Sequence, residues 1–214
     1  MMTRWLPDAR GRLTVAAIAL YGERGFEQTT VAEIAERAGV TERTFYRHFS
    51  DKREVLFGGS GDLQATVIGA IEAAPPGRAP IDVMGDAMAS AAALMQPGRD
   101  HSRGRAAVIE ANPSLQEREL LKLATLSAAS AEALRRRGVP TLAAAVAAEA
   151  GVTVFKLGFE RWIADSAAGT AGDAAGDTLG DTAGAAPESG DAPDFARCIR
   201  EALDELKALT NPSR

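Results

Sequence analysis

Side chains that donate hydrogen bonds are concentrated in one short stretch of the chain, TERTFYRHFSDK. It carries hydroxyl, guanidinium, phenol, imidazole and ammonium groups at Thr41, Arg43, Thr44, Tyr46, Arg47, His48 and Lys52. Hydroxyl, imidazole and ammonium groups bind phosphate oxygens, and arginine reaches either phosphates or the edges of bases. These residue types in so short a stretch therefore predict a surface that binds a polyanion.

The spacing of two phenylalanines predicts how this stretch is folded. Thr41 is a residue type favoured as a helix N-cap, and Phe45 and Phe49 stand at the i, i+4 spacing of one helical face. With that face turned inward, the outward face consists of Glu42, Arg43, Thr44, Tyr46, Arg47 and His48. We therefore expect a short helix that presents its polar side chains together.

Two further helices are expected before it. Apolar residues recur at helical spacing within residues 7–24, and Gly25 ends that pattern. Thr30 and Glu33 form a capping box for a second helix, which Gly39 ends. Two short helices joined by a glycine-containing turn are the helix-turn-helix arrangement, in which the second helix enters the major groove of DNA.

The same residues resemble the signature of the TetR/AcrR family. The resemblance covers residues 8–57 and is carried by TTVAEIAERAGV from Thr29, then TFYRHF from Thr44, then Lys52. It implies a homodimeric helix-turn-helix transcriptional regulator, usually a repressor, whose larger helical domain binds a ligand and dimerises. It also implies that Thr29 and Thr30 meet the DNA backbone where the second helix starts.

In this resemblance Thr44, Tyr46, His48 and Lys52 match DNA-contacting positions, and Glu42 and Arg43 occupy the positions that read bases. Many relatives have a small residue near position 43, so the operator sequence does not follow from the resemblance. Glu42 has a second interpretation, because an acid in the first turn of a helix is favoured by the macrodipole. Arg43 is either a DNA contact or a solvated arginine, and His48 either a phosphate contact or a structural histidine.

The rest of the chain predicts a larger helical unit. A fourth helix capped by Ser50 or Asp51 follows the third, and later helices are expected at about 101–111, 114–136 and 140–165. The expected domains are a DNA-binding domain at 1–53, an effector and dimerisation domain at 54–165, a flexible Ala/Gly/Asp-rich linker at 166–193, and a final helix at 194–210 that packs on the effector domain. The fold class is all-α.

Two apolar stripes in the larger unit have more than one interpretation. Met84, Met88 and Met95 form a helical stripe that is either plain core or, because methionine is adaptable, the lining of a ligand pocket. Phe155, Phe159 and Trp162 either line the same pocket or, with Ile163 and the last helix, form a four-helix bundle with a second subunit.

Other candidate residues have mainly structural interpretations. His101 follows Asp100 at an expected helix start, and nothing supports it as a ligand or a base. Arg135, Arg136 and Arg137 look like a second nucleic-acid patch, but cations are favoured in the last turn of a helix. We therefore interpret all four as structural.

The amino-acid composition limits the partners and cofactors that the sequence predicts. The formal net charge is -5, but residues 1–53 carry nine Lys/Arg against seven Asp/Glu, and the segment 166–193 holds five acids and no base. An anionic partner is therefore compatible with the acidic total. One cysteine and two histidines provide no metal cluster, no cofactor is implied, and the apolar runs look too short to span a membrane. We expect a soluble, cytoplasmic protein.

The resulting hypothesis is a DNA-binding regulator, not an enzyme, that binds a palindromic operator as a dimer and is released by a small molecule. The effector is expected to act through the fourth helix, which Gly58, Gly59 and Gly61 would allow to bend. One alternative is a DNA-binding protein without an effector. A less favoured one is a helical enzyme with a vestigial helix-turn-helix, although no phosphate-binding glycine loop or nucleophile motif is present.

Overall fold

The computed structural model describes residues 8–164 and 194–210, and every regular element within them is helical, as the composition predicts. The predicted linker at 166–193 lies outside the described residues. The elements are α1 (Ala9–Arg24), α2 (Val31–Arg37), α3 (Glu42–His48), η1 (Glu54–Phe57), α4 (Ser60–Ala73), α5 (Pro80–Met95), η2 (Gln96–Gly98), α6 (Arg99–Glu110), α7 (Pro113–Arg136), α8 (Thr141–Ala164) and α9 (Phe195–Thr210), where η marks a 3-10 helix.

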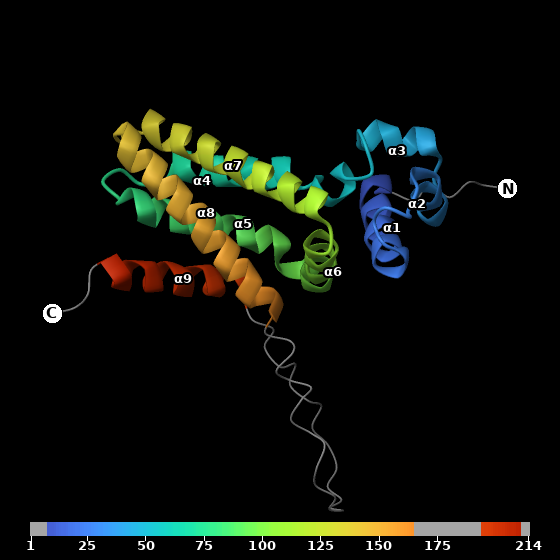
Figure 1. Ribbon diagram of the computed structural model, residues 1–214. Helices are drawn as coiled ribbons and strands as arrows, with labels where there is room; N and C mark the ends of the chain where they lie inside the picture. Colours follow the sequence, from blue (N-terminus) through green and yellow to red (C-terminus); the bar gives the residue numbers. More distant parts are fainter. Residues whose placement is uncertain (1–7, 165–193, 211–214) are drawn as a thin grey trace, which may run out of the picture.

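Two groups of helices make up the molecule (Figure 1). α1, α2 and α3 gather at the end that carries the N-terminus, and α4, α5, α7, α8 and α9 form a larger bundle. α6 lies between the groups, where it packs against α1 on one side and leads into α7 on the other. The arrangement is that of a small domain joined laterally to a larger one.

The expected cap residues form the first three helices. Gly25, with φ of 86°, ends α1 and donates its N–H to the carbonyl of Tyr21 at 2.9 Å. The capping box of Thr30 and Glu33 starts α2, and Gly39 follows it with φ of 66°. Thr41 starts α3 by accepting the N–H of Thr44 at 3.2 Å. Local sequence therefore sets the limits of these helices.

A first hydrophobic core holds the small domain together. Leu13, Ile34 and Phe45 are fully buried in it, one from each of the first three helices. The core also contains Val55, Leu56 and Phe57 from η1, and Val108, Ile109 and Leu115 from α6 and α7. The domain boundary at 53/54 stays a prediction, while the apolar packing of the first core extends to residue 57 and reaches α6.

The fourth helix differs from the expectation. The carboxylate of Asp51 accepts the N–H groups of Arg53 and Glu54, at 2.7 and 3.1 Å, and the short 3-10 helix η1 follows where a long α-helix was expected. Gly58 and Gly59 follow, and α4 begins at Ser60. Val55 and Leu56 pack into the first core, whereas Val67 and Ile71 pack into the second. The interruption arises because one continuous helix could not place these residues in both cores.

A second core fills the larger bundle. Met84, Met88 and Trp162 are 0% exposed within it, and Phe195 of α9 stacks on Trp162 with ring centroids 4.7 Å apart. Glycines allow close packing of α8: a Cβ at Gly158 would stand 3.1 Å from the backbone of Ile199 in α9. The final helix therefore packs on the larger bundle as its apolar stripe predicts.

Among the described residues α8 alone is long and apolar enough to cross a membrane, with a mean hydropathy of 1.5 in its most apolar window. The sequence runs did not suggest such a segment. Length and composition alone set this criterion, and the core helix of a bundle meets it too. In this fold α8 packs against α5, α7 and α9.

Candidate nucleic-acid interface

The short helix α3 separates its apolar and polar residues onto opposite faces. Phe45 is 0% exposed and Phe49 is buried beside it, with ring centroids 5.6 Å apart. Thr41, Glu42, Arg43, Tyr46 and Arg47 are exposed, and Thr44 and His48 are half-buried. The structure therefore leaves at the surface the six residues that the sequence predicted for the outward face of α3, with the cap residue Thr41 beside them.

Neighbouring side chains hold several of these residues. The hydroxyl groups of Thr41 and Thr44 lie 3.1 Å apart and share a hydrogen bond. Tyr46 packs edge-on against the ring of Phe45, and a side-chain nitrogen of Arg47 lies 3.5 Å from Nε2 of His48. The phenol of Tyr46 is directed to solvent by its packing, since the residue is 56% exposed.

The cations of α3 differ from the arginines of α1 and α2. Arg24 is paired with Glu33 at 2.8 Å, and Arg37 is bound to Glu23 through two contacts of 2.6 and 2.7 Å. Within the described part of the chain, neither Arg43 nor Arg47 forms an ion pair. Both guanidinium groups are thus available to an external anion.

Hydrogen bonds also keep the carboxylates of α1 and α2 ionised. Backbone and hydroxyl hydrogen bonds from Thr30 lower the pKa of Glu33. Hydrogen bonds from Arg37 lower the pKa of Glu23. These charges neutralise Arg24 and Arg37, whereas Arg43 and Arg47 of α3 have no carboxylate partner among the described residues.

The two threonines at the start of α2 are oriented differently. Thr29 is 1% exposed, and its hydroxyl donates to the carbonyl of Gly25 at 2.9 Å. Thr30 is exposed, and its hydroxyl both accepts the N–H of Glu33 and lies 2.9 Å from that carboxylate. A DNA-backbone contact for either residue stays a prediction.

Lys52 lies behind α3, with its ammonium group on backbone carbonyls. Nζ donates to the oxygens of Phe26, Glu27 and Thr29 at 2.9, 3.1 and 3.2 Å, and lies 4.5 Å from the centroid of the Phe26 ring. The sequence placed Lys52 among the DNA contacts, and that contact also stays a prediction.

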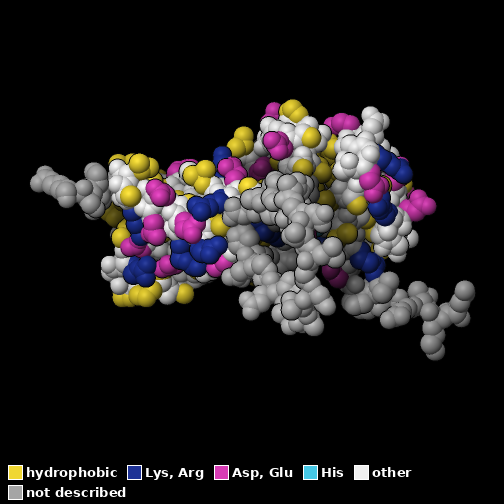
Figure 2. Space-filling view, turned by 90° about the horizontal axis from the view of Figure 1, so that it is seen from below, with side chains coloured by type: hydrophobic (Ala, Val, Ile, Leu, Met, Phe, Trp, Pro, Cys, Tyr) yellow, Lys and Arg dark blue, Asp and Glu magenta, His cyan; other side chains and the backbone are white. Residues whose placement is uncertain are grey.

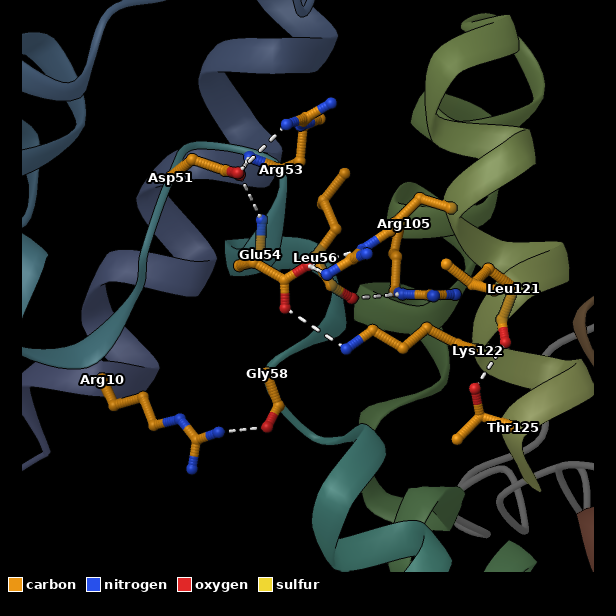
Figure 3. Close-up of polar contacts among 11 residues, drawn as sticks. Arg10, Asp51, Arg53, Glu54, Leu56, Gly58, Arg105, Leu121, Lys122 and Thr125 are labelled. Carbon is orange, nitrogen blue, oxygen red and sulfur yellow. Dashed lines mark hydrogen bonds and ion pairs between the residues drawn. The ribbon is translucent and has the colours of Figure 1, made fainter. Parts of the chain in front are cut away.

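Charged residues that the sequence analysis missed join η1 to the larger domain (Figure 3). Glu54 accepts from Nε of Arg118 at 2.7 Å and from Lys122 at 3.3 Å, both on α7. Arg105 of α6 donates to the carbonyl of Leu56 at 2.6 Å. It also pairs with Glu119 at 3.0 Å. No local pattern announces these contacts, because Glu54 and its partners are more than 60 residues apart in sequence.

The residues predicted for a ligand pocket are packed against one another. Met84, Met88, Phe155 and Trp162 belong to the buried second core, and Met95 and Phe159 lie against it. A cavity of about 260 Å³ lies instead at the α4–α5 turn, lined by residues that include Pro76, Arg78, Leu134 and Arg137. A pocket-lining role for these packed residues therefore stays a prediction.

The remaining candidates have structural positions. His101 lies in the first turn of α6, where burial and then the charge of Arg105 lower its pKa. Arg135 pairs with Glu132, Arg136 pairs with Glu72, and Arg137 donates to carbonyls of the α4–α5 turn. Among the described residues no group of His, Cys, Asp and Glu forms a metal site.

A buried aromatic face with unpaired cations on the opposite face, carried on the second helix of a glycine-linked pair, defines a helix-turn-helix protein of the DNA-binding class. Residues 13–57 match the family model described as bacterial regulatory proteins, tetR family. The helix-turn-helix domain of the chain thus matches that of the TetR family.

Comparison with individual proteins supports the same assignment. The HTH-type transcriptional regulator TcmR of Streptomyces glaucescens is 34% identical over 95 residues, which are 44% of this chain and 42% of TcmR. The match thus spans less than half of that relative.

Solved structures extend the likeness in fold to nearly the whole chain. A putative TetR-family transcriptional regulator from Syntrophomonas wolfei has a TM-score of 0.60 at 15% identity, covering 94% of each chain. The regulator FadR from Bacillus subtilis, in complex with stearoyl-CoA, has a TM-score of 0.54 at 16% identity, covering 92% of this chain and 96% of that one. At sequence identities this low, the likeness to these structures shows a shared fold alone.

Proposed function

We propose that the protein is a transcriptional regulator that binds a palindromic DNA operator as a homodimer. The observation that carries the proposal is the outward face of α3, where Arg43 and Arg47 have no carboxylate partner among the described residues, while Phe45 and Phe49 anchor the helix from behind. A single α-helix fits the major groove of B-DNA, which is about 12 Å wide.

The roles of the α3 residues follow from their positions. Glu42 and Arg43 stand in the first turn, which lies closest to the base edges when a recognition helix enters the groove. There a carboxylate accepts from a cytosine amino group and a guanidinium donates to guanine. Thr41, Thr44, Tyr46, Arg47 and His48 then bind phosphates on either side, with Thr29 and Thr30 near the backbone at the start of α2.

Binding to a palindrome requires a second subunit. The packing of the second core changes where on the molecule we place the dimer surface. Phe155 and Trp162 are 7% and 0% exposed inside one subunit, so the predicted seam from Phe155 to Ile163 cannot by itself be the dimer surface. Leu142, Val146 and Leu157 of α8 are 78%, 61% and 49% exposed. Their spacing of four and eleven residues puts them on one face, which we propose for dimer contact.

The outer side of α9 suits solvent better than a dimer core. Figure 2 shows Lys and Arg side chains among Asp and Glu side chains on the face of the molecule where α9 lies. Ion pairs there join Arg161 to Glu201 at 3.2 Å and Arg200 to Asp194 at 3.3 Å. We therefore expect α9 to flank the α8 contact instead of forming its centre.

We further propose that the regulator is a cytoplasmic repressor released by a small molecule. The structure of FadR with stearoyl-CoA supports an effector by analogy of fold. Methionine side chains adapt readily, so a ligand would enter the second core by displacing Met84 and Met88. Movement there would reach the DNA-binding domain through α6, α7 and the contacts of Glu54 and Arg105 with η1.

The filled second core favours one alternative, a DNA-binding regulator without an effector. The two proposals differ in the thermal stability of the protein with candidate ligands, because a ligand that binds the native state stabilises it. We propose no catalytic activity, in keeping with the regulatory function named for TcmR.

Selection from a pool of randomised DNA duplexes tests the proposed function. We expect enrichment of an inverted repeat whose half-site centres are one DNA turn, about 10 base pairs, or a multiple of it apart. A two-fold symmetric dimer binds an inverted repeat, so enrichment of the repeat tests sequence recognition and dimerisation together. Binding to heparin as tight as binding to every selected duplex would refute the proposal.

A further inference from the structure

Lys52 is held at its ammonium end by the segment that joins α1 to α2 and at its backbone carbonyl by α1. Its ammonium group donates to the carbonyls of Phe26, Glu27 and Thr29, as described above. Its own carbonyl accepts the hydroxyl of Tyr21 at 2.6 Å. Lys52 follows the recognition helix by four residues, so it ties the end of α3 to the loop that leads into α2.

We propose that Lys52 is a positioning residue that fixes α2 relative to the recognition helix, and not a phosphate contact. The inference rests on the proposed DNA-binding function and assigns one residue a different part in it. It departs from the expectation that the sequence pattern gave for Lys52.

The number of hydrogen-bond donors supports this role. A lysine ammonium has three donors and no acceptor. Three backbone oxygens lie within 3.2 Å of Nζ, and the face of Phe26 stabilises the same charge. Every proton thus has an acceptor in the protein, and a DNA phosphate would have to displace one of them.

The surroundings of the carbonyl end support the same role. Tyr21 is 3% exposed, and burial, followed by the charge of Asp51, raises the pKa of its hydroxyl. The hydroxyl therefore stays protonated and continues to donate to the Lys52 carbonyl at any pH at which the protein is studied. Phe26 packs edge-on against Tyr21, with ring centroids 5.1 Å apart, which closes the loop onto α1.

The loop held by Lys52 carries the cap of α2. Thr29 is anchored inward by its hydroxyl, and Thr30 begins the helix. Without the ammonium group, three carbonyls of this loop each lose a donor, and the loop is no longer bound to residue 52. The orientation of α3 on the rest of the domain then becomes less defined, which weakens docking without removing a DNA contact.

Two substitutions of Lys52 distinguish positioning from phosphate contact. Lys52→Arg keeps the charge, but a planar guanidinium cannot direct donors to three converging carbonyls as an ammonium does. Lys52→Met keeps the length without the charge. Arg78→Gln is the control, since it removes one cation beside the α4–α5 turn, at the end of the molecule remote from α3.

The readouts are the affinity for a selected duplex and its dependence on salt, at temperatures where each variant is folded. We expect both Lys52 variants to bind about tenfold more weakly, the loss expected from hydrogen bonds to a charged group. We expect the slope of log affinity against log salt to match that of the wild-type protein. The proposal is overturned if Lys52→Arg binds normally while Lys52→Met lowers the slope by about one unit, as loss of a phosphate contact does.

A spectroscopic measurement on the wild-type protein does not depend on the stability of a variant. The ε-methylene protons of Lys52 should resonate upfield because of the Phe26 ring, and they should remain so in the complex with DNA. Loss of that shift on adding the duplex would overturn the proposal. If the protein bound no duplex, the proposed function would fail, whereas the shift in the free protein would still test the contact of Lys52 with the loop.

Discussion

At the scale of single residues, charge pairing distinguishes the arginines that stabilise the fold from those that are available for binding. Arg24 and Arg37 are matched by carboxylates in α1 and α2, whereas Arg43 and Arg47 lack carboxylate partners within the described residues. Both are therefore available to an external anion such as a DNA phosphate. An exposed ion pair contributes about 1 kcal/mol or less, so pairing of this kind removes a charge from the surface more than it stabilises the fold.

Asp51 provides a prediction at this scale. Burial alone would raise the pKa of its carboxyl group, but hydrogen bonds from the N–H of Glu54 and from Arg53 outweigh burial and lower it. A lowered pKa in the folded state means that the stabilisation is complete above the unfolded value, about 3.9, and is lost as the pH falls through the folded pKa.

We therefore expect Asp51→Ala to reduce the free energy of unfolding by about 1 kcal/mol at pH 7, the usual cost of removing a cap. Below pH 4 the wild-type protein and the variant should converge in stability. Denaturant unfolding across this pH range checks the prediction. A difference that stays constant down to pH 2 would show that the carboxylate charge has no part in the cap.

Residues whose role depends on near neighbours were predictable from the sequence, and those with distant partners were not. Thr30 with Glu33, Thr41 with Thr44, and Phe45 with Phe49 interact within four residues, so their spacing indicates their contacts. Lys52 binds carbonyls 23 to 26 residues away, and Glu54 binds α7. Such contacts arise only from the fold, so residue type and the family resemblance placed Lys52 with the DNA contacts.

At the scale of elements, local sequence patterns predict the helices within each domain but not the break at the junction between the two domains. Apolar spacing and cap residues predicted α1 to α3 and the later helices to within a few residues. The same spacing suggested one helix from residue 52 onward, although its apolar residues belong to two different cores. The glycines at 58 and 59 separate these sets.

The two glycines have different surroundings. A Cβ at Gly58 would lie 2.9 Å from a ring carbon of Phe49 and 3.2 Å from the guanidinium of Arg10, which also donates to the Gly58 carbonyl. A Cβ at Gly59 would meet nothing within 4 Å, and the backbone there has φ of -83°.

We expect Gly58→Ala to destabilise the protein by about 1–3 kcal/mol through overpacking against Phe49. Gly59→Ala should be neutral or stabilise it by about 0.5–1 kcal/mol by restricting the unfolded chain. Thermal unfolding of the matched pair tests both values. Equal effects of the two substitutions would show that Phe49 does not pack against residue 58. Unchanged operator affinity and effector response in Gly59→Ala would remove the proposed hinge.

At the scale of the whole molecule, two separate cores would let the proposed effector signal pass between the domains without disrupting the packing of either. The first core includes α6 residues, and α6 leads directly into α7 of the larger bundle. Arg105 and the Glu54 contacts connect η1 to the same two helices (Figure 3). A shift of α6 and α7 would therefore move η1, and with it the helix-turn-helix, as a unit.

The all-α class and the division into a small and a larger group followed from composition and periodicity. Which apolar residues would face a second subunit did not, because Phe155 and Trp162 have the same residue types whether they line a subunit interface or a subunit interior. Only the position of α9 decides this, since Phe195 covers both rings.

The substitution Arg47→Ala tests most directly whether the outward face of α3 binds DNA. On the selected duplex, the variant should bind more weakly, and its salt slope should fall by about one unit from the wild-type value. Arg78→Gln, measured beside it, should change neither quantity. An Arg47→Ala protein with the affinity and salt slope of the wild type would contradict DNA binding through this face of α3.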